Sequence, residues 1–215
     1  MKRKLLVVIM AIAISAELLA VAKDGNNQKK SETITSNIDA AIVDASTSIL
    51  EFSPLGDDSA KVTGYKKEEN PTAIDIPSKV KIGGNVYNVT SIGDGAFGFC
   101  SSLKDITIPE GVTSIGDGAF YGCSSLKNIT IPEGMTSIGA WAFGDCSSLT
   151  DITIPEGVTS IGDCAFYECS SLTRITIPEG VTSIGEETFD GCRSLKNINI
   201  PEIDGNPSQG TPGCS

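Results

Sequence analysis

The chain repeats one unit of 23 residues. "SSLKDITIPEGVTSIGDGAFYGC" at residues 101–123 returns as "SSLKNITIPEGMTSIGAWAFGDC" at 124–146 and as "SSLTDITIPEGVTSIGDCAFYEC" at 147–169. The dipeptide Ile-Pro begins at residues 76, 108, 131, 154, 177 and 200, so every interval after the first is 23 residues. A fixed short period predicts a solenoid, in which each unit is one coil packed against its neighbours.

Each unit is expected to form two short strands and a turn. The pattern "L-x-x-I-x-I-P" alternates apolar and polar residues, which is typical of a strand with one buried face, and proline ends that strand. "VTSI" is a second extended stretch, and "DGAFYGC" is expected to be a tight helical turn. In the unit at 101–123, the residues expected inside are Leu103, Ile106, Ile108, Val112, Ile115, Ala119, Phe120 and Cys123.

The predicted fold is mostly β: a leucine-rich repeat solenoid of about five to six stacked coils with an N-terminal β-hairpin cap. The sequences "SILEF" and "AKVTGY" flank the turn signal "PLGDD" and predict the cap over residues 46–70. The solenoid is expected over residues 71–202, after a flexible linker at 23–45 and before a polar tail at 203–215. Extra residues around "KIGGNVYN" explain the long first interval as a loop or small hairpin.

Residues 1–22 have the features of a signal peptide. Three basic residues, Lys2, Arg3 and Lys4, precede the apolar run "LLVVIMAIAIS", which is too short for a stable transmembrane anchor. The small residues "AVA" at 20–22 follow as a cleavage pattern. These features predict a secreted or cell-surface protein with no membrane insertion after signal removal, and an uncleaved anchor is the alternative.

Charge and composition exclude several classes of function. The net charge is −11 and histidine is absent, so nucleic acid and anionic membranes are not expected partners. Histidine is the commonest general base and the commonest metal ligand. The sequence contains neither a repeated nucleophile–base pair nor a glycine-rich phosphate loop before a helix. We therefore expect no enzymatic activity, no cofactor and no metal.

The unit "SSLxxITIPEGVTSIGxxAFxxC" resembles the BspA-like leucine-rich repeat family of bacterial and protozoal surface proteins, over about residues 70–202. The resemblance implies an exported module for protein binding or adhesion, with a host matrix or cell-surface protein as ligand. A structural spacer without its own ligand is the alternative, and sugar binding by an aromatic edge is a weaker one. The polar ending shows no closing cap, so the tail, another chain or further sequence is expected to cover the last coil.

Two surfaces are candidates for partner binding. The first is the outward face of the main strand, where a varied column accompanies a threonine column: Asp105 and Thr107, Asn128 and Thr130, Asp151 and Thr153, Arg174 and Thr176, then Asn197 and Asn199. The second is an edge with Trp141, Tyr121, Tyr167 and Phe99. Exposed tryptophan is a favoured interface anchor. The alternatives are a merely soluble strand face, and rings that pack on the turn of their own coil.

Cysteine and glutamate also form columns. The cysteines are Cys100, Cys123, Cys146, Cys169 and Cys192, with Cys164 and Cys214 out of register. They are expected to point inward as free thiols; disulfides between adjacent coils are the alternative, and zinc is disfavoured because a straight column cannot surround a tetrahedral ion. The glutamates Glu110, Glu133, Glu156, Glu179 and Glu202 are expected to form a solvated acidic edge, with calcium bridging as the alternative. The oligomeric state is left open.

Overall fold

A computed structural model describes residues 42–56 and 58–199, which form short strands and turns with one 3₁₀ helix, η1 (Lys67–Glu69). The predicted signal peptide, nearly all of the predicted linker and the polar tail lie outside these residues. The strands of the first part are β1 (Val43–Asp44), β2 (Leu50–Pro54), β3 (Ser59–Tyr65), β4 (Ala73–Asp75), β5 (Lys79–Ile82) and β6 (Asn85–Ile92). The repeats contribute β7 (Asp105–Thr107), β8 (Ser114–Ile115), β9 (Ser137–Ile138), β10 (Asp151–Thr153), β11 (Ser160–Ile161), β12 (Arg174–Thr176), β13 (Ser183–Ile184) and β14 (Asn197–Asn199).

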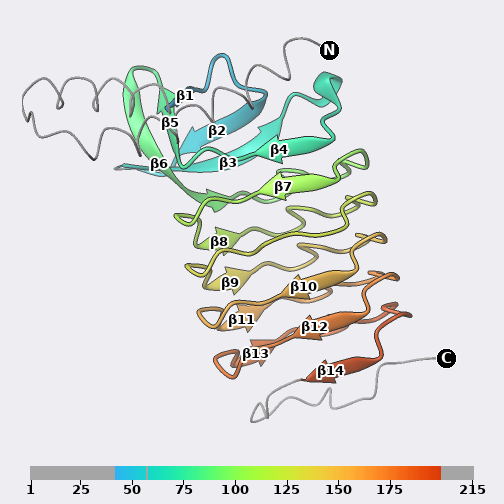
Figure 1. Cartoon of the computed structure of the whole chain (residues 1–215). Helices are drawn as coiled ribbons and strands as arrows, with labels where there is room; N and C mark the ends of the chain where they lie inside the picture. The colour runs from blue at the N-terminus through green and yellow to red at the C-terminus, as the bar shows by residue number, and fades with distance from the viewer. Residues whose placement is uncertain (1–41, 57, 200–215) are drawn as a thin grey trace, which may run out of the picture. The chain divides into compact units, whose positions relative to one another are not determined.

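Successive repeats stack as parallel coils, which confirms the predicted solenoid (Figure 1). Strands β8, β9, β11 and β13 continue one nine-stranded sheet, and residues 23 positions apart lie opposite each other, as Ile115 does to Ile138. The main strands pair on another side of the coils as β4–β7 and as β10–β12–β14. Because the register equals the repeat, every residue lies beside its equivalent in the next coil.

The core consists of ladders of equivalent apolar residues. Phe97, Phe120, Phe143 and Phe166 are fully buried, and their rings stack with centroids 5.3–5.4 Å apart. The isoleucine, leucine and valine columns of the repeat are buried in the same cluster. No coil could bury these side chains alone, so the apolar burial that stabilises the fold arises between coils.

The N-terminal cap supplies the first rung of two ladders. The predicted hairpin is present as β2 paired antiparallel to β3, and β3 pairs in parallel with β6. Val62 in β3 lies opposite Ile92, and the Tyr65 ring stacks on Phe97 at 6.2 Å. The extra residues of the first interval form a second hairpin, β5–β6, as predicted. The cap thus covers the first repeat with side chains in the register of the repeats themselves.

The prediction of a helical turn at "DGAFYGC" is wrong. The structure has a succession of turns there, because two positions in each coil adopt left-handed backbone angles that a right-handed helix cannot contain. In the coil that contains Trp141 these positions are Trp141 (φ 58°) and Asp145 (φ 56°). Glycine occupies several equivalent positions in other coils, which is the sequence signal for this conformation.

The column cysteines point inward as predicted, and they are free thiols in the structure. From the second coil on, each column thiol donates to the carbonyl oxygen of the phenylalanine 26 residues earlier: Sγ of Cys146 lies 3.2 Å from the Phe120 oxygen, and Sγ of Cys169 lies 3.1 Å from the Phe143 oxygen. The thiols therefore satisfy carbonyl groups of the preceding coil while they fill the core.

Because of the buried thiols, the free energy of unfolding is expected to depend on pH in the alkaline range. Burial raises the pKa of Cys146 from 9.0 to about 12, so the folded state keeps a proton that the unfolded state loses. The free energy of unfolding should fall as the pH rises, by about 2 kcal/mol for this thiol between about pH 9 and about pH 10.5. Urea unfolding measures this slope. The control is Cys146→Ala, which should show a shallower slope, and equal slopes would contradict the prediction.

Candidate functional site

One edge of the stack is formed by the turns that follow the "SIG" sequence of each coil. We call residues 93–100, 116–123, 139–146, 162–169 and 185–192 the edge segments. Their backbones are joined from coil to coil by hydrogen bonds: the N–H groups of Trp141, Phe143 and Asp145 each donate to a carbonyl of the next coil at 2.8 Å. The side chains that project from this edge are therefore mounted on a fixed backbone.

The left-handed positions form two columns along this edge. The first contains Gly95, Gly118, Trp141, Cys164 and Glu187, and the second contains Phe99, Gly122, Asp145, Glu168 and Gly191, with φ between 52° and 74°. The first column contains Trp141, which the sequence predicted to lie on an exposed edge. A left-handed angle costs a non-glycine residue on the order of 1 kcal/mol, so tryptophan occupies this slot against the preference of the backbone.

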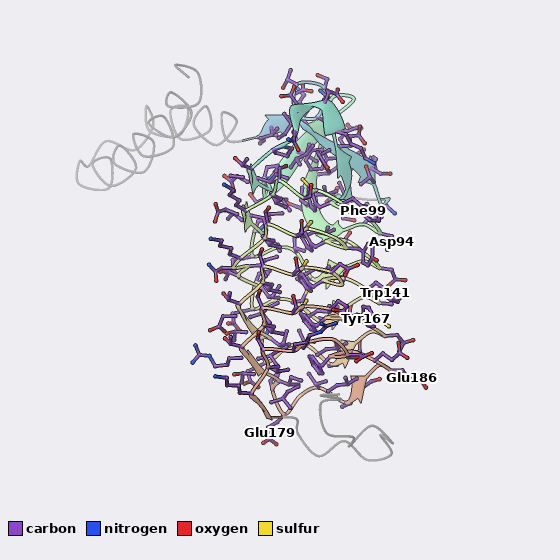
Figure 2. The ribbon with its side chains drawn as sticks, turned by 90° about the vertical axis from the view of Figure 1, so that its right-hand side faces the viewer. Asp94, Phe99, Trp141, Tyr167, Glu179 and Glu186 are labelled. Atoms are coloured by element: carbon purple, nitrogen blue, oxygen red, sulfur yellow. The ribbon has the colours of Figure 1, made fainter. Side chains whose placement is uncertain are left out.

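Four aromatic side chains, Phe99, Tyr121, Trp141 and Tyr167, form a continuous row on this edge, which we call the aromatic row. Ring centroids lie 5.2 Å apart for Phe99 and Tyr121, 5.7 Å for Tyr121 and Trp141, and 5.2 Å for Trp141 and Tyr167. Phe99 is 74% exposed and Trp141 is 38% exposed. Figure 2 shows Phe99, Trp141 and Tyr167 along one side of the stack. The rings thus pack across coils and still present apolar surface to solvent.

Carboxylates surround the tyrosines of the row. A hydrogen bond with Asp145 raises the pKa of Tyr121. Burial and then the charges of Glu168, Asp190 and Glu187 raise the pKa of Tyr167. Both tyrosine hydroxyls therefore remain protonated at neutral pH, and the aromatic row lies in a negative field.

A shallow groove of about 530 Å³ borders the edge segments. The short strands β8, β9, β11 and β13 contribute Ser114, Ser137, Ser160 and Ser183 to its lining. The edge segments contribute Asp117 and Asp163. These aspartates each accept a backbone N–H from the next coil through Oδ1, at 2.8 Å for Asp117 and 2.9 Å for Asp163. This groove was not predicted from the sequence, although the serine that precedes "IG" in four successive repeats lines it.

The strand face places its predicted residues in columns on the outside of the coils. Asp105, Thr107, Asn128, Thr130, Thr153, Arg174 and Thr176 are exposed, and Asp151 is half-buried. Asn197 and Asn199 continue the columns in β14, where their side chains are outside the described part. Arg174 forms an ion pair with Asp151 of the preceding coil, Nη2 to Oδ2 at 2.7 Å. Two of the varied residues thus contact each other rather than project independently.

The strand face is interrupted in the middle of the stack. The coil with Asn128 and Thr130 forms no main strand and makes only one bridge, from Asn128 to Asp151. A hollow of about 320 Å³ lies there, lined in part by Thr130, Asp151 and Thr153. The strand face is therefore two sheet fragments around a small hollow rather than one flat surface.

The glutamate column lies on the surface. Glu110, Glu133, Glu156 and Glu179 are exposed, and Glu202 is outside the described residues. Over residues 42–56 and 58–199, no three histidine, cysteine, aspartate or glutamate side chains gather closely enough to hold a metal ion. In the same residues, no helix has the length and apolar character needed to cross a membrane.

Comparison with known proteins matches residues 90–206 to the BspA type leucine-rich repeat region, in six copies. A leucine-rich repeat protein from Bacteroides ovatus is similar in structure, with a TM-score of 0.67 and 37% identity over 72% of this chain and 40% of that protein. The leucine-rich repeat protein of T. pallidum has a TM-score of 0.66 and 32% identity over 71% of this chain and 69% of its own. No curated protein gave a significant match. The chain belongs to the BspA-type leucine-rich repeat family.

Proposed function

We propose that the chain is an exported protein-binding module, at the cell surface or secreted, that attaches to a host matrix or cell-surface protein through the aromatic row. The observation that carries this proposal is the uninterrupted contact of four exposed or half-buried rings across four coils. Large amphipathic rings on a rigid support are the side chains that most often dominate protein interfaces. The export part of the proposal rests on the signal-peptide pattern at residues 1–22.

The rigidity of the edge supports this choice over the strand face. Hydrogen bonds between coils hold the backbone that carries the rings, and the rings contact each other across coils, so little conformational entropy is lost on binding. Trp141 also occupies a left-handed position that glycine fills in two other coils. On the strand face, Arg174 and Asp151 already satisfy each other, which leaves fewer free groups for a partner.

Binding to a panel of immobilised matrix proteins (collagen, laminin and fibronectin) tests the proposal. We expect at least one of them to bind the chain, and Trp141→Ala to weaken that binding about tenfold or more. Thr153→Ala is the matched control on the strand face and should leave the affinity unchanged.

Two results would contradict this assignment. A weakening by Thr153→Ala or Arg174→Glu, without one by Trp141→Ala, would move the site to the strand face. Absence of binding to every matrix protein and to host cells would favour a spacer that presents other parts of a longer protein.

A further inference from the structure

The edge segments are acidic and carry no basic residue. Their sequences "GDGAFGFC", "GDGAFYGC", "GAWAFGDC", "GDCAFYEC" and "GEETFDGC" contain neither lysine nor arginine. Their carboxylates are Asp94, Asp117, Asp145, Asp163, Glu168, Glu186, Glu187 and Asp190. The basic residues between them, Lys104, Lys127 and Arg174, belong to the strand side of the coils. Negative charge is therefore concentrated beside the aromatic row.

The carboxylates and the rings share one surface. Asp94 and Glu186 lie on the same side of the stack as Phe99, Trp141 and Tyr167 (Figure 2). Burial raises the pKa of Tyr167 most, and the nearby charges of Glu168, Asp190 and Glu187 raise it further. This surface therefore presents apolar rings and negative charge at once.

One guanidinium group already binds at this surface. Arg193, just beyond the last edge segment, places Nη2 at 3.5 Å from Oε1 of Glu168, and its side chain remains 78% exposed. Among the carboxylates of the described edge, Glu168 alone has such an ion pair. The other carboxylates lack a cationic partner within the described chain. Several of them accept a backbone N–H, but none has its charge neutralised, so covering them with an apolar or acidic partner would be unfavourable.

We propose that the aromatic row and the carboxylates beside it bind an extended, arginine- or lysine-rich segment of a partner protein. This inference rests on the proposed function and names the chemistry of the partner. Guanidinium groups stack on tyrosine and tryptophan faces, and the carboxylates of the edge accept their hydrogen bonds. The basic stems cover the rings, so one kind of side chain satisfies both halves of the surface.

Calorimetric titration with two synthetic peptides tests this inference on the full chain. In the first peptide arginine alternates with glycine and serine, and in the second glutamate replaces each arginine. We expect saturable binding of the arginine peptide that weakens steeply as salt is raised, and no binding of the glutamate peptide. Trp141→Ala should weaken the arginine peptide about fivefold or more.

A pair of double variants separates local from general charge effects. Glu187→Gln with Asp190→Asn removes two carboxylates beside Tyr167 and should weaken the arginine peptide about tenfold. Glu156→Gln with Glu179→Gln removes the same charge from the exposed glutamate column and should change the affinity less than about twofold. Circular dichroism verifies that both variants fold.

The inference is overturned by equal weakening in the two double variants, by equal binding of the two peptides, or by no binding of the arginine peptide. The proposed function can survive the failure of this inference. If a matrix protein binds in a Trp141-dependent way but is insensitive to salt and to the Glu187→Gln, Asp190→Asn variant, the aromatic row remains the binding surface and its partner is not basic. Absence of Trp141-dependent binding to any matrix protein or host cell is the result that contradicts the proposed function itself.

Discussion

Replacement of Phe143 by alanine is expected to lower the free energy of unfolding by about 3–5 kcal/mol. The Phe143 ring is fully buried and stacks on Phe120 at 5.3 Å and on Phe166 at 5.4 Å. Its removal leaves a cavity between coils whose backbones are joined by hydrogen bonds and cannot close in. Chemical denaturation of the variant and the wild type measures the difference.

Phe99→Ala is the matched control for this prediction. Phe99 is 74% exposed, so its loss should cost less than about 1 kcal/mol despite the same change in side-chain size. A similar loss of stability in the two variants would show that the stacked rings of the core do not carry the stability of the solenoid.

Gly139→Ala should destabilise the protein by about 3 kcal/mol, at the upper end for overpacking. A Cβ atom at Gly139 would lie 2.7 Å from both the Asp117 nitrogen and the Gly116 carbonyl carbon. These are backbone atoms of the preceding coil, so the two coils would have to separate. Thermal unfolding is the measurement, with a fall in the midpoint of several degrees expected.

Gly111→Ala is the control for Gly139→Ala. It shows whether the loss of stability comes from the close contact between coils or from the addition of a methyl group at any glycine of the repeat. A Cβ atom there meets only the Val89 carbonyl oxygen, at 3.4 Å, which is an ordinary contact. The variant should stay within about 0.5 kcal/mol of the wild type. A stable Gly139→Ala protein, or equal loss in both variants, would contradict the close approach of coils at "SIG".

The repeat period was sufficient to predict the fold because it specifies both register and core. Residues 23 positions apart must become neighbours in a solenoid, so the inward direction of Phe120 and Cys123 follows from the apolar pattern of one unit. The hairpin before the repeats was predicted from its own turn signal. Its role as the first rung, through Val62 and Tyr65, was not, because those residues lie outside the repeat pattern.

The candidate site was predictable only in part. The sequence placed Trp141, Tyr121 and Tyr167 near one edge, but their contacts across coils depend on two left-handed positions per coil. Glycine at several of these positions indicates the left-handed backbone angles, and the prediction of a helical turn did not take this into account. The sequence likewise does not predict that the coil with Asn128 lacks a main strand, because the residues of that repeat match those of its neighbours.

The central claim is that the stacking of the coils brings equivalent edge positions together into one surface, and that a partner binds there. Trp141 is the one tryptophan of the chain, so protein labelled with 5-fluorotryptophan gives a single fluorine NMR signal from the middle of that surface. With a matrix protein that binds in the panel, the account predicts a saturable chemical-shift change of this signal at the concentrations where binding occurs. Saturable binding with an unchanged chemical shift would contradict it.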